Sequence, residues 1–167
     1  MNRNLYVAMG ITGSGKSTVG EMLALKLGVD FVEGDDYHSR ENIERMASGI
    51  PLTDQDRADW LRSLANRIRG ASHASRGLVL TCSALKRSYR DVLRAGVPDV
   101  QFIFLKGDRE VIAKRLAERS GHFMPPSLLD SQVATLEEPA YDEHAWLYAI
   151  EWSAEDIVTD IVARASV

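Results

Sequence analysis

Residues 9–18, MGITGSGKST, follow the apolar run LYVA at 5–8 and precede a segment with helical spacing. They satisfy the pattern G-x-x-x-x-G-K-[ST], in the strand-to-helix context in which this pattern wraps around phosphate groups. The glycines let backbone N–H groups point inward, and the N-terminus of the following helix adds positive potential. A chance glycine-rich turn would not explain why strand, spacing, lysine and hydroxyl coincide. The stretch therefore predicts a nucleoside triphosphate site.

Each residue of this loop has an expected task at the triphosphate. Lys16 is expected to reach the outer phosphates and to be catalytic, and the Ser17 hydroxyl is expected to bind Mg²⁺. The loop residues expected to bind the nucleotide are Gly10, Thr12, Gly13, Ser14, Gly15, Lys16, Ser17 and Thr18.

Short apolar runs alternate with longer segments of helical spacing along the chain. This alternation is typical of strands and helices in a parallel sheet. The predicted strands lie within residues 5–9, 30–33, 78–84, 100–106 and 145–152. We therefore expect the α/β fold class: one domain over residues 1–167, with a mostly five-stranded parallel sheet flanked by helices in three layers.

Local signals predict where several of these elements begin and end. Gly28 is expected to end the first helix, and Thr53 or Asp54 is expected to cap the helix that carries Trp60. The Gly/Ser/His-rich piece RGASHASRG at 69–77 predicts a loop between elements.

Composition limits the partners of the chain. Its 167 residues carry 20 basic and 24 acidic side chains, and the net charge of −4 disfavours nucleic acid and anionic membrane surfaces. The single cysteine, Cys82, cannot form an internal disulfide and is expected in the core. The first residues lack the long apolar region of a signal peptide or a membrane-spanning helix. We expect a cytoplasmic protein that acts on a small molecule.

Two carboxylates stand at the end of the second predicted strand. Glu33 and Asp35 are two residues apart, so in an extended backbone their side chains share a face. The tip of a strand beside the phosphate-loop strand faces the place where ligands bind in open α/β sheets. No strand ends in the aspartate that usually supports Mg²⁺, so either Glu33 or Asp35 is expected to take that role while the other accepts the proton of an attacking hydroxyl. Of the two arrangements we favour Glu33 at the metal and Asp35 as the proton acceptor. Solvated loop acids are the alternative.

Phosphate loops also occur in nucleotide-dependent switch proteins, so other residues must show which class of nucleotide-binding protein this is. The sequence LKGD at 105–108 stands where a guanine-reading motif would, but it lacks the asparagine, and no Asp-x-x-Gly sequence occurs. These features disfavour a switch GTPase, and the acidic balance disfavours an ATPase that binds nucleic acid. Asp108 is better explained as a cap of the helix that begins near Arg109.

Three segments resemble the small gluconate kinases (gluconokinases), phosphate-loop enzymes related to shikimate and adenylate kinases. They are GDDYHSRENIERMASGIPLTDQDRADWL at 34–61, CSALKRSYRDVLR at 82–94 and RSGHFMPPSLLDSQVATLEEP at 119–139. The resemblance implies the P-loop kinase fold, a cytoplasmic homodimer, and ATP- and Mg²⁺-dependent transfer of the γ-phosphoryl group to the 6-hydroxyl of D-gluconate. The nearest alternative is a kinase of the same fold that acts on another hydroxy acid, such as shikimate.

Gluconate is a linear polyol with one carboxylate, so its site needs a cation of fork geometry and several hydrogen-bonding groups. The resemblance places Arg57 where the related shikimate kinases have the arginine that binds the substrate carboxylate. Without the resemblance, a surface ion pair is the simpler interpretation of the arginines. The expected substrate-binding residues are Asp35, His38, Arg57, Lys86, Arg90 and His122.

Arg115 and Arg119 are four residues apart and are therefore neighbours on one helical face. In the related kinases such a pair lies across the phosphates and beside the adenine, so both residues are expected to bind the nucleotide and Arg119 to be catalytic. Gly121 and two prolines at 125–126 exclude a continuous helix here. We expect a lid over about residues 119–127, which would exclude water from the reacting groups.

Overall fold

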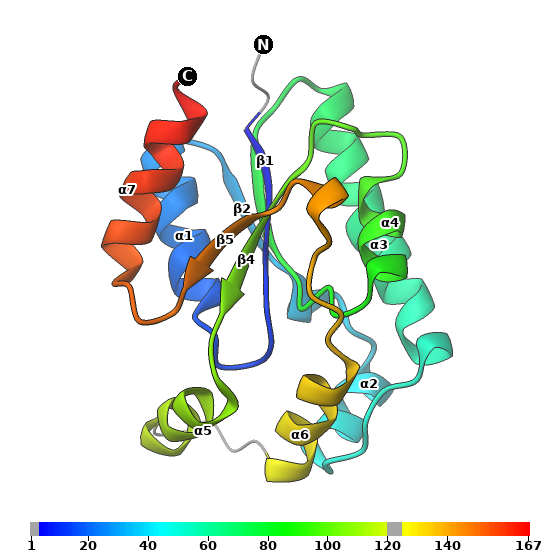
Figure 1. Ribbon diagram of the computed structural model, residues 1–167. Coiled ribbons are helices and arrows are strands. Elements are labelled where there is room, and N and C mark those ends of the chain that lie inside the picture. The colour runs from blue at the N-terminus through cyan, green and yellow to red at the C-terminus, as the bar shows by residue number, and fades with distance from the viewer. Residues whose placement is uncertain (1–3, 120–124) are drawn as a thin grey trace.

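The computed structural model describes residues 4–119 and 125–167. Within this part of the chain, five strands form one sheet (Figure 1). The strands are β1 Leu5–Met9, β2 Asp30–Glu33, β3 Leu78–Thr81, β4 Gln101–Lys106 and β5 Trp146–Ala149. Their order across the sheet is β2-β3-β1-β4-β5, and every neighbouring pair is parallel. The predicted five-stranded parallel sheet is confirmed.

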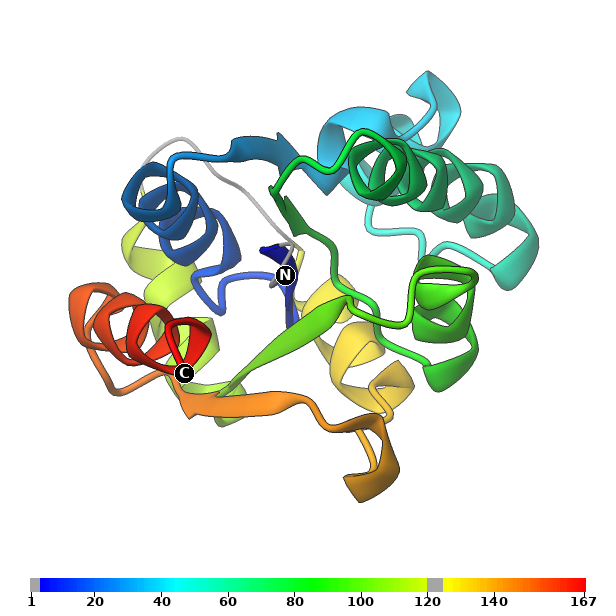
Figure 2. The same ribbon diagram turned by 90° about the horizontal axis from the view of Figure 1, so that it is seen from above.

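Helices cover both faces of this sheet. They are α1 Lys16–Leu27, α2 Arg40–Ala47, α3 Asp54–His73, α4 Arg87–Arg94, α5 Arg109–Glu118, α6 Pro126–Thr135 and α7 Ala154–Ala165. Figure 2 shows α1 and α7 on one face and α3 and α4 on the other, which confirms the three layers. In Figure 1, α2, α5 and α6 lie beyond the carboxyl ends of the strands. No helix in the described ranges is long and apolar enough to span a membrane.

Two of the three inner strands are buried along their whole length. Every residue of β1 and of β3 is buried, as expected for a parallel sheet covered by helices on both faces. Side chains such as Leu80 and Ile103 are completely buried, and each contributes about 1.5–3 kcal/mol by leaving water. This core fixes the loops that leave the carboxyl ends of β1, β2 and β3, and these loops carry most of the residues singled out in the sequence.

Two predicted helix boundaries are confirmed. Gly28 ends α1 in the left-handed conformation, with φ of 67°, which costs a glycine little. Thr53 caps α3: its hydroxyl accepts a hydrogen bond from the N–H of Asp56, whose carboxylate accepts one from the N–H of Thr53. This reciprocal pair is a capping box.

The loop predicted at 69–77 is shorter than the composition indicates. Helix α3 continues through His73, so residues 69–73 are helical and residues 74–77 form the connection to β3. Ser72 is buried on the same face as Ile68, and this packing outweighs the weak helix propensity of Gly70 and Ser72.

Gly34→Ala tests the tight contact between the tips of β2 and β3. A Cβ at Gly34 would lie 1.9 Å from the carbonyl oxygen of Thr81, so the backbone must move. We expect the free energy of unfolding, measured with urea, to fall by about 3 kcal/mol. Gly70→Ala is the control: its Cβ would meet nothing within 4 Å, and a gain of about 0.5–1 kcal/mol is expected. Equal stability of the two variants would contradict this account.

Candidate active site

The phosphate loop joins β1 to α1. Two of its N–H groups are engaged by the protein: that of Thr12 donates to Gln132 Oε1 at 2.8 Å, and that of Ser14 donates to the carbonyl oxygen of Ile11 at 3.2 Å. Gly15 precedes α1 in the left-handed conformation with φ of 96°, and no side chain caps the helix. Gly10 has a φ of 152°, and a Cβ there would lie 2.8 Å from the carbonyl oxygen of Leu105. Glycine is therefore required at Gly10 by close packing and favoured at Gly15 by its backbone angle. The uncapped helix N-terminus is suited to hold an anion.

Lys16 turns its ammonium group into this loop. Its Nζ donates a hydrogen bond to the carbonyl oxygen of Ile11 at 3.1 Å. Burial lowers the pKa of Lys16, while the carboxylates of Asp35 and Glu33 oppose this shift. A half-buried cation facing the loop interior is the group expected for the outer phosphates.

A cavity of about 400 Å³ adjoins the phosphate loop. It is lined both by residues of that loop and by the pair Arg115 and Arg119. Arg115 donates a hydrogen bond to the carbonyl oxygen of Ile150 at 2.5 Å, which holds its guanidinium against the segment between β5 and α7. Trp152 and Ser153 of that segment also line the cavity, and sequence reasoning missed them because they match no base-reading motif. The expected residues that line the cavity are Gly13, Ser14, Gly15, Thr18, Arg115 and Arg119.

The two residues expected at the metal are in direct contact. The Ser17 hydroxyl donates a hydrogen bond to Glu33 Oε2 at 2.5 Å, and the Thr81 hydroxyl donates one to Glu33 Oε1 at 2.6 Å. Thr81 ends β3, where an aspartate would usually be sought. Sequence reasoning missed Thr81 because its role depends on the pairing of β2 with β3.

Asp35 does not share an extended strand with Glu33, so that part of the prediction is wrong. β2 ends at Glu33, and residues Gly34–Tyr37 form the 3₁₀ turn η1. The Asp35 side chain is 72% exposed, yet the protein around it displaces enough water to raise its pKa. Lys16 opposes this rise and Glu33 adds to it. The 3₁₀ turn, and not an extended strand shared with Glu33, therefore places Asp35 near Lys16.

His38 follows η1 and is held against α3. Its side chain is 3% exposed, and its Nε2 lies 4.0 Å from Asp35 Oδ1. The imidazole stacks on Trp60 with ring centres 4.0 Å apart and planes at 18°. Burial lowers the pKa of His38 to about 4, with a further contribution from Arg57. The ring is therefore neutral at pH 7.

Arg57 and Lys86 lie together with Tyr89 and Asp54, and we call these four residues the Arg57–Tyr89 cluster. Arg57 donates to the Tyr89 hydroxyl at 3.0 Å, Tyr89 donates to Asp54, and Lys86 Nζ donates to Asp54 at 3.0 Å. Both cations lie over the Tyr89 ring, at 5.4 and 5.7 Å from its centre. Among the described residues, no carboxylate lies within ion-pair distance of Arg57. Tyr89 was missed because it resembles an ordinary core aromatic.

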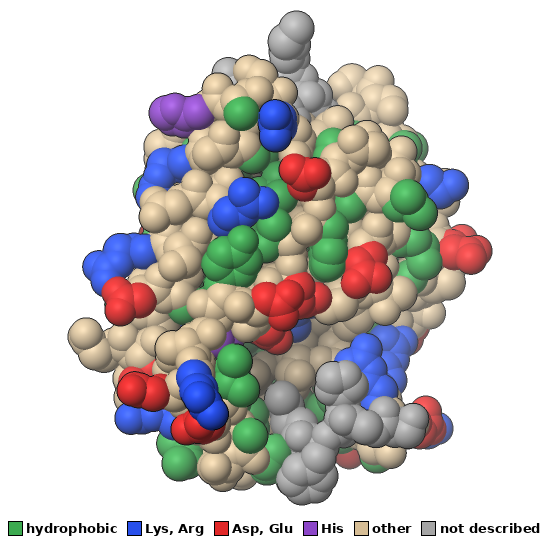
Figure 3. All heavy atoms as spheres, turned by 180° about the vertical axis from the view of Figure 1, so that it is seen from behind, with side chains coloured by type: hydrophobic (Ala, Val, Ile, Leu, Met, Phe, Trp, Pro, Cys, Tyr) green, Lys and Arg blue, Asp and Glu red, His purple; other side chains and the backbone are tan. Residues whose placement is uncertain are grey.

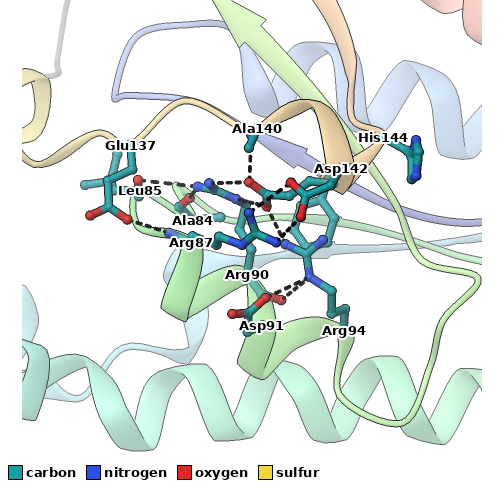
Figure 4. Close-up of polar contacts among 12 residues, drawn as sticks. Ala84, Leu85, Arg87, Arg90, Asp91, Arg94, Glu137, Ala140, Asp142 and His144 are labelled. Atoms are coloured by element: carbon teal, nitrogen blue, oxygen red, sulfur yellow. Dashed lines mark hydrogen bonds and ion pairs between the residues drawn. The ribbon is translucent and has the colours of Figure 1, made fainter.

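Arg90 is not placed for substrate binding, which corrects the expectation. It is 1% exposed, and its Nε and Nη2 donate to Glu143 at 2.7 and 3.0 Å. Its Nη1 donates to the carbonyl oxygen of Ala84 at 2.8 Å. Figure 4 shows Arg90 enclosed by the loop after β3 and the segment that carries Ala140. Its charge serves to join two backbone segments. His122, also expected to bind substrate, lies outside the described residues.

Comparisons with known proteins agree with this geometry. A sequence model of the shikimate kinase family matches residues 12–165. Gluconokinase of Gluconobacter oxydans (strain 621H) is 50% identical over 137 residues, which cover 82% of this chain and 77% of the relative. The chain belongs to the gluconokinases of the shikimate kinase family.

Two further gluconokinases extend the match. Thermoresistant gluconokinase of Escherichia coli (strain K12) is 46% identical over 142 residues, covering 85% of this chain and 81% of the relative. The crystal structure of a gluconokinase from Sinorhizobium meliloti 1021 has a TM-score of 0.88 and 43% identity, and covers 99% of this chain and 93% of that one. The predicted family and the predicted α/β kinase fold are confirmed.

Glu143→Gln tests the buried pair with Arg90 in this gluconokinase-family chain. Burial alone would raise the pKa of Glu143, but hydrogen bonds from Arg90, Ala140 N–H and Arg94 lower it to about 2. Glutamine leaves the Arg90 charge buried without its partner, so we expect a loss of about 3 kcal/mol in urea unfolding at pH 7.

The same substitution has a defined pH dependence. A lowered carboxyl pKa stabilises the fold above the ordinary value of 4.5, and this stability disappears as the pH falls toward 2. The difference between wild type and Glu143→Gln should therefore shrink between pH 5 and pH 3. Asp142→Asn, which removes an exposed pair with Arg87, should cost less than about 1 kcal/mol. Equal losses in the two variants would contradict a special role for the buried pair.

Proposed function

We propose that this protein is a gluconokinase that transfers the γ-phosphoryl group of ATP to the 6-hydroxyl of D-gluconate. The observation that carries the proposal is Arg57, a guanidinium with a neutral phenol as its hydrogen-bond partner, in a chain whose phosphate loop is intact. Such a cation suits the carboxylate of a sugar acid. The names of the relatives at 46% and 50% identity support the same substrate.

In the proposed reaction, the phosphate loop, Lys16 and Arg119 hold the triphosphate. The oxygen of the substrate hydroxyl forms a bond to the γ-phosphorus, and the bond from that phosphorus to the β-phosphate oxygen breaks, so ADP leaves with that electron pair. Asp35 takes the hydroxyl proton. Its raised pKa makes it a better base than an ordinary aspartate. Most of the acceleration comes from positioning and from neutralising phosphate charge.

The Arg57–Tyr89 cluster holds the acid end of the substrate in this proposal. Arg57 makes paired hydrogen bonds to the carboxylate, and Lys86 adds a second positive charge. Asp54 is already engaged by Tyr89 and Lys86, which limits its repulsion of an incoming anion. Shikimate is the second candidate, because a model of the shikimate kinase family matches the chain and shikimate also carries one carboxylate and several hydroxyls.

The oxygen groups near the loop fit a magnesium ion. Ser17 Oγ and the Glu33 carboxylate are hard donors held in contact, and Mg²⁺ is commonly bound by one or two such groups together with phosphate oxygens. We propose that Ser17 and Glu33 hold it, with Thr81 orienting the carboxylate. When bound, the ion supplies neutralisation of charge on the β- and γ-phosphates.

We further propose a cytoplasmic homodimer that binds neither nucleic acid nor membrane. Figure 3 shows one face on which basic and acidic side chains are interspersed, and the net charge is −4; both support the lack of a polyanion surface. Leu147 on the edge strand β5 is 54% exposed and Tyr141 nearby in sequence is 96% exposed. Apolar groups on an open sheet edge support pairing with a second copy.

A panel of acceptors tests the proposed activity. Purified protein with Mg²⁺ and ATP is given D-gluconate, other sugar acids, shikimate or nucleoside monophosphates in separate reactions, and ADP release is measured. We expect strong turnover with D-gluconate and little ATP hydrolysis without an acceptor. Turnover with shikimate but not gluconate would support the second candidate, and slow hydrolysis indifferent to every acceptor would contradict a small-molecule kinase.

Glu33→Gln tests the proposed metal site. The neutral amide keeps the size of the side chain but removes its charge, so the Mg²⁺ concentration for half-maximal activity should rise at least tenfold. Nucleotide binding in the absence of Mg²⁺ should change less than twofold, measured by calorimetry. Asp30→Asn, an exposed acid at the other end of β2, is the matched control. An unchanged Mg²⁺ response in Glu33→Gln would remove Glu33 from the metal site.

A further inference from the structure

Asn42 links α2 to α3 and to the candidate site. The residue is 6% exposed and stands in the first turn of α2. Its Nδ2 donates a hydrogen bond to the backbone carbonyl oxygen of Asp56 at 2.8 Å. The same Nδ2 lies 3.4 Å from Nδ1 of His38. One buried amide nitrogen thus faces both a backbone carbonyl and the imidazole ring.

These contacts assign the orientation of the amide. A backbone carbonyl can accept a hydrogen bond but cannot donate one, so the atom facing Asp56 must be the NH₂ nitrogen and not the amide oxygen. That nitrogen has two hydrogens, so the one not donated to Asp56 is available to Nδ1 of His38, 3.4 Å away. Nδ1 of His38 must therefore accept, since a proton on Nδ1 would oppose the amide hydrogen in a buried place.

His38 consequently carries its proton on Nε2. The ring is neutral at pH 7, since burial lowers its pKa to about 4, and a neutral imidazole has one N–H. Stacking on Trp60 fixes the ring plane, and Trp60 is itself anchored by donating to the Gly34 carbonyl oxygen at 2.8 Å. The Nε2–H group is therefore held on the side of the ring where Asp35 Oδ1 lies, 4.0 Å away.

The separation of 4.0 Å between Nε2 and Asp35 Oδ1 is too long for a direct hydrogen bond, but one oxygen at about 2.8 Å from each atom fits between them. A hydroxyl there would accept from His38 and donate to Asp35. Donor and acceptor together fix both the place and the orientation of that hydroxyl. With the opposite tautomer, Nε2 would present a lone pair, and two acceptors would compete for the one hydroxyl proton.

We propose that Asn42 is a positioning residue that sets the tautomer of His38. In this tautomer His38 donates a hydrogen bond to a substrate hydroxyl, and Asp35, not His38, receives the proton of that hydroxyl. The effect of Asn42 on catalysis rests on the proposed sugar-acid kinase activity. The tautomer itself is a property of the protein without substrate. This allows the two ideas to be tested separately.

The tautomer is measured in the unliganded protein by two-bond ¹H–¹⁵N correlation spectra, which distinguish Nδ1–H, Nε2–H and doubly protonated rings. The four histidines are resolved by the loss of one signal set in His38→Gln. We expect the Nε2–H pattern for His38 from pH 6 to pH 8. An Nδ1–H or doubly protonated ring in wild type over this range would overturn the proposal.

Asn42→Asp tests the positioning role with almost no change in shape. A carboxylate at position 42 accepts from Nδ1–H, so the His38 signals should move to the Nδ1–H or doubly protonated pattern. Asp35 and Arg57 are the charged groups that also act on this ring. We expect kcat with gluconate to fall about tenfold or more, with the KM for ATP unchanged.

Asn42→Ala is the second variant. It is needed because the new carboxylate in Asn42→Asp would also face the Asp56 carbonyl oxygen, which gives misfolding as another explanation for a loss of activity. Alanine removes the amide and should give a mixture of tautomers with an intermediate kcat. Asn66→Asp makes the same substitution at a residue that contacts Arg69 in α3 and should change neither spectrum nor rate. A changed tautomer with an unchanged kcat would overturn the positioning role, whereas the expected tautomer in a protein inactive with gluconate would refute the proposed function alone.

Discussion

The hydroxyl of Thr81 joins the parts on which the site depends. It donates to Glu33 and accepts from the N–H of Gly34, so it ties the end of β3 to the end of β2. Glu33 in turn receives the Ser17 hydroxyl from the start of α1, which places the phosphate loop against the same point. Gly34 fits because it has no Cβ to meet the Thr81 carbonyl oxygen. One short set of hydrogen bonds therefore sets the distance between the triphosphate loop and the turn that carries Asp35.

Arg90 and Arg57 show that the hydrogen-bond partner of an arginine determines whether its charge is available to a ligand. Arg90 is buried and its guanidinium is shared between Glu143 and backbone carbonyls, so it stabilises the join between two segments and has little left to offer a ligand. Arg57 instead meets the hydroxyl of Tyr89, a neutral acceptor that orients the guanidinium without cancelling its charge. In the proposed reaction this difference makes Arg57 available to a carboxylate. Arg90 and Arg57 thus have the same side chain, but Arg90 stabilises the fold whereas Arg57 is left to bind a ligand in the proposed reaction.

The sequence predicts the features that depend on neighbouring residues. The strands follow from apolar runs, the phosphate loop from its spacing, and the ends of α1 and α3 from Gly28 and the Thr53 cap. It does not predict features that depend on distant partners. Arg90 and Arg57 look alike until Glu143, 53 residues from Arg90, is folded against it. The turn after Glu33 was missed because strand alternation gives no sign of where β2 stops, and Tyr89 and Asn42 acquire their roles through contacts with α3.

Loss of water shifts the pKa values of both Asp35 and His38 in the proposed site, although the Asp35 side chain is 72% exposed and that of His38 only 3%. It raises the pKa of Asp35, because a carboxylate is charged when deprotonated, and lowers that of His38, because an imidazole is charged when protonated. Both shifts favour the neutral form, yet their chemical effects differ. Asp35 becomes a stronger base, whereas His38 becomes a poorer one and, with Nδ1 occupied by Asn42, turns a fixed N–H outward. One environment thus makes one proton acceptor and one proton donor from two neighbouring side chains, which is the combination required to orient a single attacking hydroxyl.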